Sequence, residues 1–310
     1  MSSSLIRRVL MTALSLALVG VSCGGGADSA ARCEGGTVCL DALTRDSVRV
    51  DLLQAQQVLP AGEGTFTFGM VTRQGALLTG GSPEVWIARD GRARPIGPFR
   101  ATFHRFTQDH EDHSPRTPLT GFYAAPVSIP APGKWQVAAV ADVNGSRLVG
   151  ARTLSVTSGE GPAEVGTKAI PVRTPVAKNT AEAREICTRK PPDPMHYISL
   201  DRALANGKPT VVTFATPLLC ESQICGPVVD EQLLVFERIG AKRANFVHVE
   251  EFPPGADLKP DPSTIPSYWR KWGFTTEPWT VVIDGDGVIR ARFEGPVVAA
   301  LIEEALRPLL

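Results

Sequence analysis

Two cysteines, Cys220 and Cys225, lie where a predicted strand passes into a predicted helix. The strand is the apolar run 210–215, and the stretch 214–227 reads FATPLLCESQICGP. A cysteine at a helix start is surrounded by unpaired amide groups and the positive end of the helix dipole, which favour its thiolate. The residue types and their position therefore point to thiol–disulfide chemistry.

The spacing of the two cysteines restricts their geometry. A disulfide needs Cα atoms within roughly 4.4–6.8 Å, whereas five residues of continuous helix advance about 7.5 Å. If Pro227 is the first helical residue and Gly226 its cap, both cysteines lie in the preceding loop. If Ser222 is the cap, Cys225 lies in the first turn and Cys220 outside it. Either placement permits a disulfide.

The elements that must position the pair follow one another at short intervals. Val229, Leu233 and Phe236 have helical spacing on one face, and Gly240 ends that helix. The remaining elements are a helix at 200–206 between Ser199 and Gly207, a strand at 245–250, a helix across 268–272, a hairpin at 279–283 and 288–293, and a closing helix at 296–306. This order predicts an α/β domain over residues 196–310.

Residues 196–310 resemble a thioredoxin-like domain of the membrane-tethered TlpA and ResA kind. The resemblance lies in the strand VVTFAT, the cysteine pair that opens a helix, the stretch TTEPWTVVIDGDGVI and the final helix. In that family a cis-proline precedes the hairpin and faces the active cysteine, which implies Pro278 here, with backbone groups open to an extended substrate. The resemblance also implies that Cys220 attacks a substrate disulfide and Cys225 resolves the mixed disulfide. No cofactor is expected.

This chain departs from the family at the site itself, because the family has two residues between its cysteines and this chain has four. Local charge also favours the opposite assignment of roles, since Glu221 opposes a thiolate at Cys220 and the helix start favours one at Cys225. A disulfide that only stabilises the loop is the main alternative. The protein would then be a non-enzymatic envelope binding protein.

Two further alternatives carry less weight. A peroxiredoxin has a threonine three residues before its cysteine, whereas Thr216 lies four before Cys220. A Sco-like copper carrier would recruit His196 or His248 to the cysteine pair, but we interpret His248 as an ordinary strand residue. Phe214 and Trp279 are expected in the core.

Residues 46–158 read as short β-like runs separated by turn signals. The runs lie at 48–53, 65–72, 84–88, 122–129, 135–143 and 148–156, and Asn144-Gly145 favours a tight hairpin between the last two. We expect an antiparallel sandwich of immunoglobulin-like type. The run TGFYAAPVSIPAPGKWQVAAVADVNG resembles the closing strands of YtkA-like extracytoplasmic domains.

The predicted fold class is therefore multidomain, an N-terminal all-β immunoglobulin-like sandwich followed by a C-terminal α/β thioredoxin-like fold. Residues 159–195 contain many prolines, which prevent long regular structure. We interpret this segment as an interdomain linker with a short helix near 181–186.

A loop within the sandwich is rich in imidazole and carboxylate groups, from His104, Asp109, His110, Glu111, Asp112 and His113. Such side chains are suitable ligands for divalent metal ions. The loop has no strict ligand spacing, so we favour a solvated polar loop and predict no resident metal.

The first 22 residues have the pattern of a signal peptide. Arg7 and Arg8 precede an apolar run at 9–21, which is short for a membrane-spanning helix. Cys23 follows, and the junction resembles a bacterial lipoprotein signal whose cysteine becomes the lipidated first residue, although Gly20 replaces the usual aliphatic residue. We expect a membrane anchor at Cys23, a tether at 23–45, and a location in the bacterial cell envelope outside the cytoplasm.

Export places the remaining cysteines where disulfides persist. Cys33 and Cys39 can close a local disulfide, which leaves Cys187 without an assigned partner. The 32 basic residues balance 32 acidic ones, so the chain has no global field that would attract nucleic acid. The expected partners are envelope protein thiols or disulfides, and the membrane through the lipid anchor.

Overall fold

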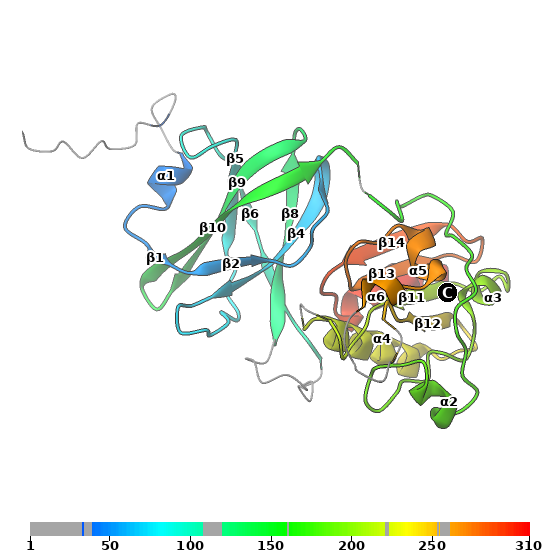
Figure 1. Ribbon diagram of the computed structural model, residues 1–310. Helices are drawn as coiled ribbons and strands as arrows, with labels where there is room; N and C mark the ends of the chain where they lie inside the picture. Colours follow the sequence, from blue (N-terminus) through cyan, green and yellow to red (C-terminus); the bar gives the residue numbers. More distant parts are fainter. Residues whose placement is uncertain are drawn as a thin grey trace, which may run out of the picture.

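The computed structural model describes residues 33, 39–107, 120–159, 161–220, 223–252, 254 and 261–310. Figure 1 shows a β-rich unit in blue to green, followed by an α/β unit in green to red. Within the described residues, no helix has the length and hydropathy needed to cross a membrane. The predicted signal segment and Cys23 lie outside the described residues.

The N-terminal unit packs two sheets face to face. One sheet has the order β1-β10-β9-β5-β6, with β3 also beside β10, and the other has the order β2-β4-β8-β7. Their bounds, with a short leading helix α1 (Leu40–Leu43), are β1 (Val48–Arg49), β2 (Asp51–Gln54), β3 (Leu59–Pro60), β4 (Gly62–Val71), β5 (Glu84–Ala88), β6 (Ile96–Arg100), β7 (Thr102–Arg105), β8 (Gly121–Ile129), β9 (Gly133–Val143) and β10 (Ser146–Thr157).

Alternation of side chains places the core between these sheets. Phe66, Phe68 and Met70 of β4 are fully buried, and they belong to the same apolar cluster as Val137 and Ala139 of β9. Because strand side chains alternate between faces, every second residue reaches the core and the intervening residues face outward. All six predicted β runs form strands in the structure, although the run 48–53 is divided into β1 and β2.

Two features of the sandwich were not predicted. Strands β6 and β7 lie at the edges of their sheets with no fully buried residue, so their sequences lack the apolar alternation of an inner strand. The expected antiparallel pairing is confirmed throughout the sheet β2-β4-β8-β7, whereas in the other sheet β1 and β3 both pair with β10 in parallel. Local sequence patterns do not encode these two pairings, because β1 and β3 lie far from β10 along the chain.

The C-terminal unit is built on a four-stranded mixed sheet of order β12-β11-β13-β14. β11 (Thr210–Phe214) is parallel to β12 (Asn245–Val249) and antiparallel to β13 (Trp279–Ile283), which forms a hairpin with β14 (Ile289–Glu294). The helices are α2 (Thr180–Arg184), α3 (Leu200–Leu204), α4 (Cys225–Ile239), α5 (Ser267–Trp272) and α6 (Ala299–Leu306), with short 3₁₀ turns η2 (Pro262–Thr264) and η3 (Arg307–Leu309). The predicted order of elements is confirmed.

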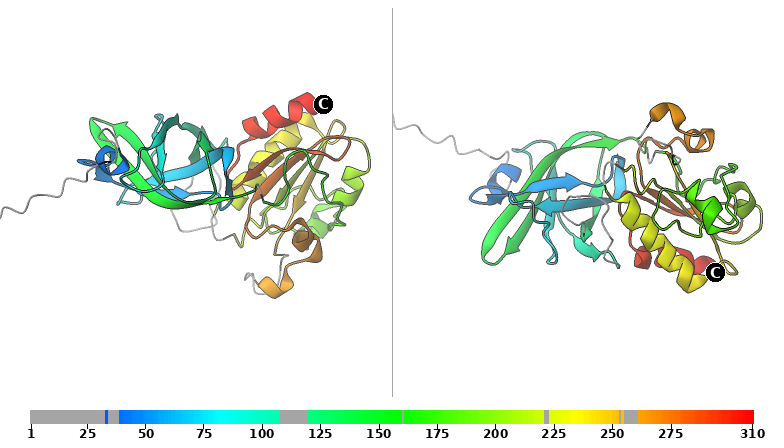
Figure 2. Two further views of the ribbon diagram at one scale, coloured as in Figure 1. Left: turned by 90° about the horizontal axis from the view of Figure 1, so that it is seen from above. Right: turned by 60° about the horizontal axis from the view of Figure 1, so that its bottom comes forward.

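Helices cover both faces of this sheet. Val211 and Val282 belong to the apolar cluster of α4 and α6, whereas Val212 and Val281 belong to the cluster of α3 and α5. Figure 2 shows α4 in yellow and α6 in red side by side, with α5 in orange on the opposite side of the sheet. Burial on both faces explains why the β11 sequence is apolar without alternation.

The proline-rich segment packs against the α/β unit along much of its length. Ala169 and Val172 are buried in the cluster of α3 and α5, and Lys168 forms a β-bridge with Val288. The expected short helix is α2, where the Asn179 side chain accepts a hydrogen bond from the amide of Glu182 at 3.0 Å. This segment therefore contributes core residues in addition to joining the two units.

Specific contacts join the sandwich to the α/β unit. The buried Glu231 carboxylate of α4 accepts hydrogen bonds from the Thr107 amide and hydroxyl and, at 2.7 Å, from the amide of Ala299. Phe106 and Phe122 of the sandwich belong to the same apolar cluster as α4 and α6. Glu231 thus connects the sandwich, α4 and the start of α6.

Replacement of Glu231 by Ala is expected to lower the free energy of unfolding by about 1–3 kcal/mol, because buried donors lose their acceptor. Urea denaturation of the full chain measures the effect. Glu237→Ala, at an exposed position of the same helix, is the matched control and is expected to change stability little. Equal losses in the two variants would contradict the connecting role of Glu231.

Candidate functional site

The two cysteines at the start of α4 form a disulfide. Cys220 and Cys225 are joined with a Cα–Cα distance of 6.1 Å. Cys225 is the first residue of α4, whereas Cys220 lies in the preceding turn, where its amide donates to the carbonyl of Thr216 at 3.0 Å. Of the two placements considered, the one with only Cys225 in the helix is observed. The N-cap residue of α4 is Ile224. Glu221 and Ser222 lie outside the described residues.

The two sulfur positions differ in exposure. Cys225 is fully buried, whereas Cys220 is partly exposed. Cys220 therefore reaches the surface in part, whereas the packing around α4 covers Cys225.

Pro278 lies at the start of β13, and the Glu277–Pro278 peptide bond is cis. The carbonyl oxygen of Pro278 accepts a hydrogen bond from the amide of Gly295 at 2.9 Å. Trp279 is buried in one core cluster with Phe214, in line with the expectation for both residues.

Glu277 is a site residue that the sequence interpretation missed. One carboxylate oxygen of Glu277 and the sulfurs of Cys220 and Cys225 all lie within 4.8 Å of one another. In the stretch TTEPW, the resemblance draws attention to the proline alone. An acidic residue directly before the proline expected to face the cysteines was the available signal.

The surroundings of Glu277 favour its neutral form. Burial, followed by the nearby Glu251 carboxyl, raises the pKa of Glu277 well above its ordinary value of 4.5, although hydrogen bonding to Thr216 opposes the shift. Burial also raises the pKa of Glu251 to about 7. The sulfur pair thus lies beside a carboxyl group that holds its proton more tightly than an ordinary glutamate.

A second group of reactive side chains comes together away from this pair. Cys187, which is free and buried, lies with Asp193, His196 and His248, and the ligand atoms of the four residues are within 4.8 Å of one another. His248 occupies β12, as expected for a strand residue, but it contacts Asp193 at 2.8 Å. Neither histidine is grouped with the Cys220–Cys225 pair, so the arrangement lends no support to a Sco-like copper site.

Charges within this group influence one another. Burial opposes ionisation of Asp193, but His248 holds the pKa of that carboxyl well below its ordinary value. Burial likewise opposes a charge on His248, yet Asp193 raises the pKa of the imidazole well above its usual range. Burial raises the pKa of the Cys187 thiol. Cys187 and Asp193 come from the segment interpreted as a linker, whereas His196 and His248 lie in the predicted α/β domain, so no local pattern links the four residues.

The other candidate residues are placed as follows. Cys33 and Cys39 form the expected disulfide. His104 lies in β7, where its ring stacks on Phe122 at 5.4 Å between centroids and burial lowers its pKa. The other members of the histidine-rich loop, residues 109–113, lie outside the described residues, so the choice between a polar loop and a metal site stays a prediction.

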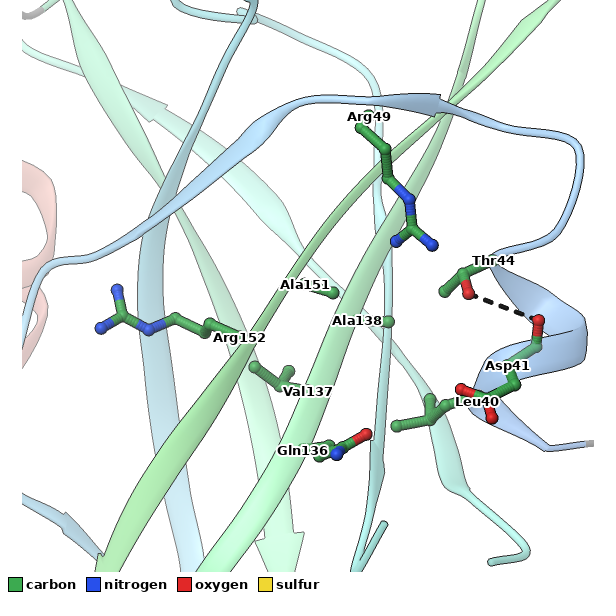
Figure 3. Close-up of a pocket in the computed structure, with 9 residues that line it drawn as sticks. All are labelled: Leu40, Asp41, Thr44, Arg49, Gln136, Val137, Ala138, Ala151 and Arg152. Atoms are coloured by element: carbon green, nitrogen blue, oxygen red, sulfur yellow. Dashed lines mark hydrogen bonds between the residues drawn. The ribbon is translucent and has the colours of Figure 1, made fainter. Parts of the chain in front are cut away.

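Two hollows open elsewhere on the described surface. A cleft of about 480 Å³ lies between the units, with His104 and Phe122 on one side and Trp279, Arg292 and Glu294 on the other. A smaller pocket of about 230 Å³ lies between α1 and the sandwich, as Figure 3 shows. The smaller pocket has Arg49 and Arg152 at its edge, but neither cysteine of the redox pair lines either hollow.

No family model matches the chain, and no curated protein sequence matches it. Among solved structures, similarity extends to a secreted thiol-disulfide isomerase from Corynebacterium glutamicum, at 15% identity over 36% of this chain and 75% of that chain, with a TM-score of 0.28. A thioredoxin-family thiol:disulfide interchange protein from Chlorobium tepidum matches at 14% identity over 46% of this chain and 99% of that chain, with a TM-score of 0.27.

The sandwich has its own distant match, the Lin-41 filamin domain. That similarity has 12% identity over 34% of this chain and 85% of that chain, with a TM-score of 0.19. TM-scores of this size do not by themselves assign a fold or an activity.

The raised pKa of Glu277 leads to a prediction about stability. Between its ordinary value of 4.5 and its raised folded pKa, the folded state binds the proton more tightly than the unfolded state. The free energy of unfolding should therefore fall as pH rises through this window, by at most about 1.4 kcal/mol per pH unit for one proton. Glu277→Gln is expected to flatten the fall, and Glu250 and Glu251, whose pKa values burial raises to about 7, contribute to what remains.

Chemical denaturation of wild type and Glu277→Gln between about pH 5 and pH 8 measures this slope. Glu304→Gln, at an exposed position of α6, is the matched control. Identical slopes in wild type and Glu277→Gln would show that the carboxyl of Glu277 titrates normally.

Proposed function

We propose that this chain is a thiol–disulfide oxidoreductase of the bacterial envelope, exported and tethered to the membrane through Cys23. The observation that carries the proposal is the Glu277 carboxyl beside the Cys220–Cys225 disulfide at the start of α4, next to the cis Glu277–Pro278 bond. The strand order and the position of the pair support a thioredoxin-like catalytic unit. The two disulfides are in keeping with an oxidising compartment.

Exposure supports Cys220 as the attacking residue and Cys225 as the resolving residue. Only Cys220 is open to a protein substrate, since Cys225 is fully buried. The position of Cys225 as first residue of α4 keeps both sulfurs near the unpaired amides of the helix start. Those amides and the helix dipole stabilise a thiolate at Cys220 in the reduced protein.

In the reducing direction, the Cys220 thiolate attacks a substrate disulfide. A bond forms between Cys220 and one substrate sulfur, while the other substrate sulfur leaves as a thiolate and takes up a proton. Cys225 then loses its proton and attacks Cys220, which restores the protein disulfide and releases the second substrate thiol. Two electrons and two protons pass to the substrate, and the reverse sequence oxidises a substrate dithiol.

Glu277 is placed to move the proton in these steps. Its carboxyl group lies within 4.8 Å of both sulfurs and, through its raised pKa, exchanges a proton closer to neutral pH than an ordinary glutamate. In the carboxylate form it accepts the proton of the Cys225 thiol, and in the acid form it supplies one to the leaving thiolate.

Cys220→Ser and Cys225→Ser are each expected to abolish insulin reduction, because one removes the attacking sulfur and the other the resolving sulfur. Turbidity of reduced insulin in the presence of dithiothreitol measures the activity. Cys33→Ser, which opens the disulfide near the predicted tether, is the matched control and should retain the wild-type rate.

The reduction potential of the Cys220–Cys225 pair separates catalysis from a structural bond. A catalytic pair should have a potential above about −300 mV. An inactive wild type with a potential well below that value, and a lower Tm in both serine variants, would identify the disulfide as a stabilising bond in a non-enzymatic binding protein.

Glu277→Gln is expected to lower the rate of insulin reduction about a hundredfold, the range typical of a lost proton-transfer group. The pH dependence of the remaining activity should lose the titration of Glu277. Steady-state rates across pH measure both effects, with Glu304→Gln as control. An unchanged rate and pH profile would exclude Glu277 from proton transfer.

A further inference from the structure

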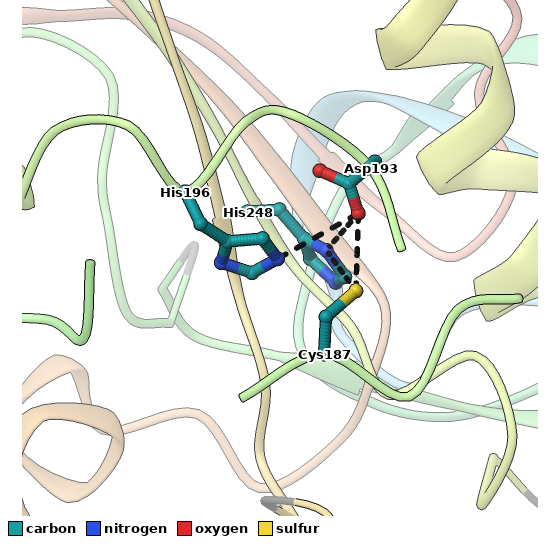
Figure 4. A group of neighbouring side chains, drawn as sticks. All are labelled: Cys187, Asp193, His196 and His248. Carbon is teal, nitrogen blue, oxygen red and sulfur yellow. Dashed lines mark hydrogen bonds and ion pairs between the residues drawn. The ribbon is translucent and has the colours of Figure 1, made fainter. Parts of the chain in front are cut away.

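The group of Cys187, Asp193, His196 and His248 takes no part in the proposed redox reaction. Figure 4 shows the four side chains converging from the segment before α3 and from β12. Their exposed fractions are between 1% and 5%. We propose that they bind one zinc ion, which holds the segment 187–196 against the sheet.

The distances between the candidate ligand atoms are close to those of a tetrahedral zinc site. Asp193 Oδ2 lies 3.3 Å from Cys187 Sγ and 3.6 Å from His196 Nε2, and Cys187 Sγ lies 3.9 Å from His248 Nδ1. Zinc bonds of about 2.0–2.3 Å place tetrahedral ligand atoms roughly 3.3–3.8 Å apart. The pair Asp193 and His248, at 2.8 Å, has to separate by about 0.5 Å to fit that geometry.

Two of these side chains form hydrogen bonds to groups outside the cluster, as the side chains of metal ligands commonly do. His248 directs Nδ1 into the group, while its Nε2 lies 3.0 Å from the carbonyl oxygen of Ala215. The second carboxylate oxygen of Asp193 accepts a hydrogen bond from the amide of Met195 at 2.9 Å. A ligating histidine characteristically donates its other ring N–H to a backbone carbonyl, and ligating carboxylates are themselves hydrogen-bonded.

His196 supplies an independent observation. Its Nε2 is buried and has no hydrogen-bond partner among the described residues, since Asp193 at 3.6 Å is too distant. A buried polar atom without a partner is costly and rare. An Asp193–His248 ion pair alone leaves the His196 nitrogen without a partner and gives no role to the free Cys187 thiol beside it. A metal ion would be bound by both atoms.

The donor set favours zinc over harder ions. One sulfur, two imidazole nitrogens and one carboxylate oxygen form a closed four-ligand set of the kind found in structural zinc sites, whereas magnesium and calcium prefer oxygen ligands alone. On binding, the Cys187 thiol and the Nδ1–H of the His248 imidazolium both lose their protons to solvent. The charges of this thiolate and of Asp193 then balance those of Zn²⁺.

The zinc site is expected to influence the neighbouring redox turn only through packing. Thr188, next to Cys187, donates to Glu250 at 2.9 Å and accepts a hydrogen bond from the Leu218 amide at 3.2 Å. Zinc binding is independent of the proposed oxidoreductase activity, so either can be disproved without the other.

The test uses the full chain without a polyhistidine tag, under non-reducing conditions that keep both disulfides closed. Elemental analysis after dialysis against zinc should find about one zinc ion per chain. Replacement by Co²⁺ should produce the thiolate-to-cobalt charge-transfer band and the intense visible bands of a tetrahedral site. Chelation of the metal should lower the Tm.

Cys187→Ser should lose the charge-transfer band, and His248→Gln should weaken metal retention at least tenfold. His104→Ala, which alters another imidazole, is the matched control and should keep the wild-type spectrum. Should the ligand variants fail to fold, the wild-type cobalt spectrum and zinc content decide the question. Less than about one-tenth of a zinc ion per chain with no thiolate band, or full metal retention in folded Cys187→Ser, would overturn the proposal.

Discussion

Thr216 connects the parts of the candidate redox site. Its carbonyl oxygen accepts hydrogen bonds from the amides of Leu219 and Cys220, which form the turn before α4. Its hydroxyl accepts from the amides of Glu251 and Phe252 after β12, and its side chain bonds to Glu277 before β13. Thr216 itself is fully buried. The geometry of the disulfide relative to Glu277 and Pro278 therefore depends on this one residue at the end of β11.

The sandwich supports the same helix from the other side. α4 begins with Cys225 and carries Glu231 less than two turns later, where Glu231 receives hydrogen bonds from Thr107 of the sandwich and from the start of α6. Glycine is required at 295, because its φ is +78° and a Cβ there would collide with the carbonyl oxygen of Ala55 in the sandwich. The sandwich is thus part of the support of the redox helix.

The described part of the chain contains sulfur in two contrasting environments. Cys220 is partly exposed at a helix start, where amide dipoles favour a thiolate. Cys187 is buried among two imidazoles and a carboxylate, and burial raises the pKa of its thiol. A protein substrate cannot reach a buried thiol of this kind. The thiol can instead bind a metal ion that becomes enclosed as the chain folds. The two sites therefore differ in what they can bind.

The sequence by itself determined the order of the elements and the position of the Cys220–Cys225 pair. Periodicity, turn residues and the apolar run 210–215 were enough to predict the order of helices and strands, because these signals act between residues close along the chain. The same signals predicted that Cys220 and Cys225 lie between a strand and a helix, and that a proline precedes the hairpin. Tertiary structure decided the rest. Glu277 meets the sulfurs because β13 pairs with β11, and the edge strand β6 and the parallel strands β1 and β3 depend on pairing partners far along the chain.

The group around Cys187 shows the same limit most clearly. Its members come from a proline-rich segment and from β12, separated by up to 61 residues. Their types were visible in the sequence, but their meeting required the segment to pack back onto the sheet. Prolines identify where regular structure ends and carry no information about which surface an irregular segment contacts, because that choice is made by burial of side chains such as Ala169 and Val172. Only the folded chain brings the four ligands to one point.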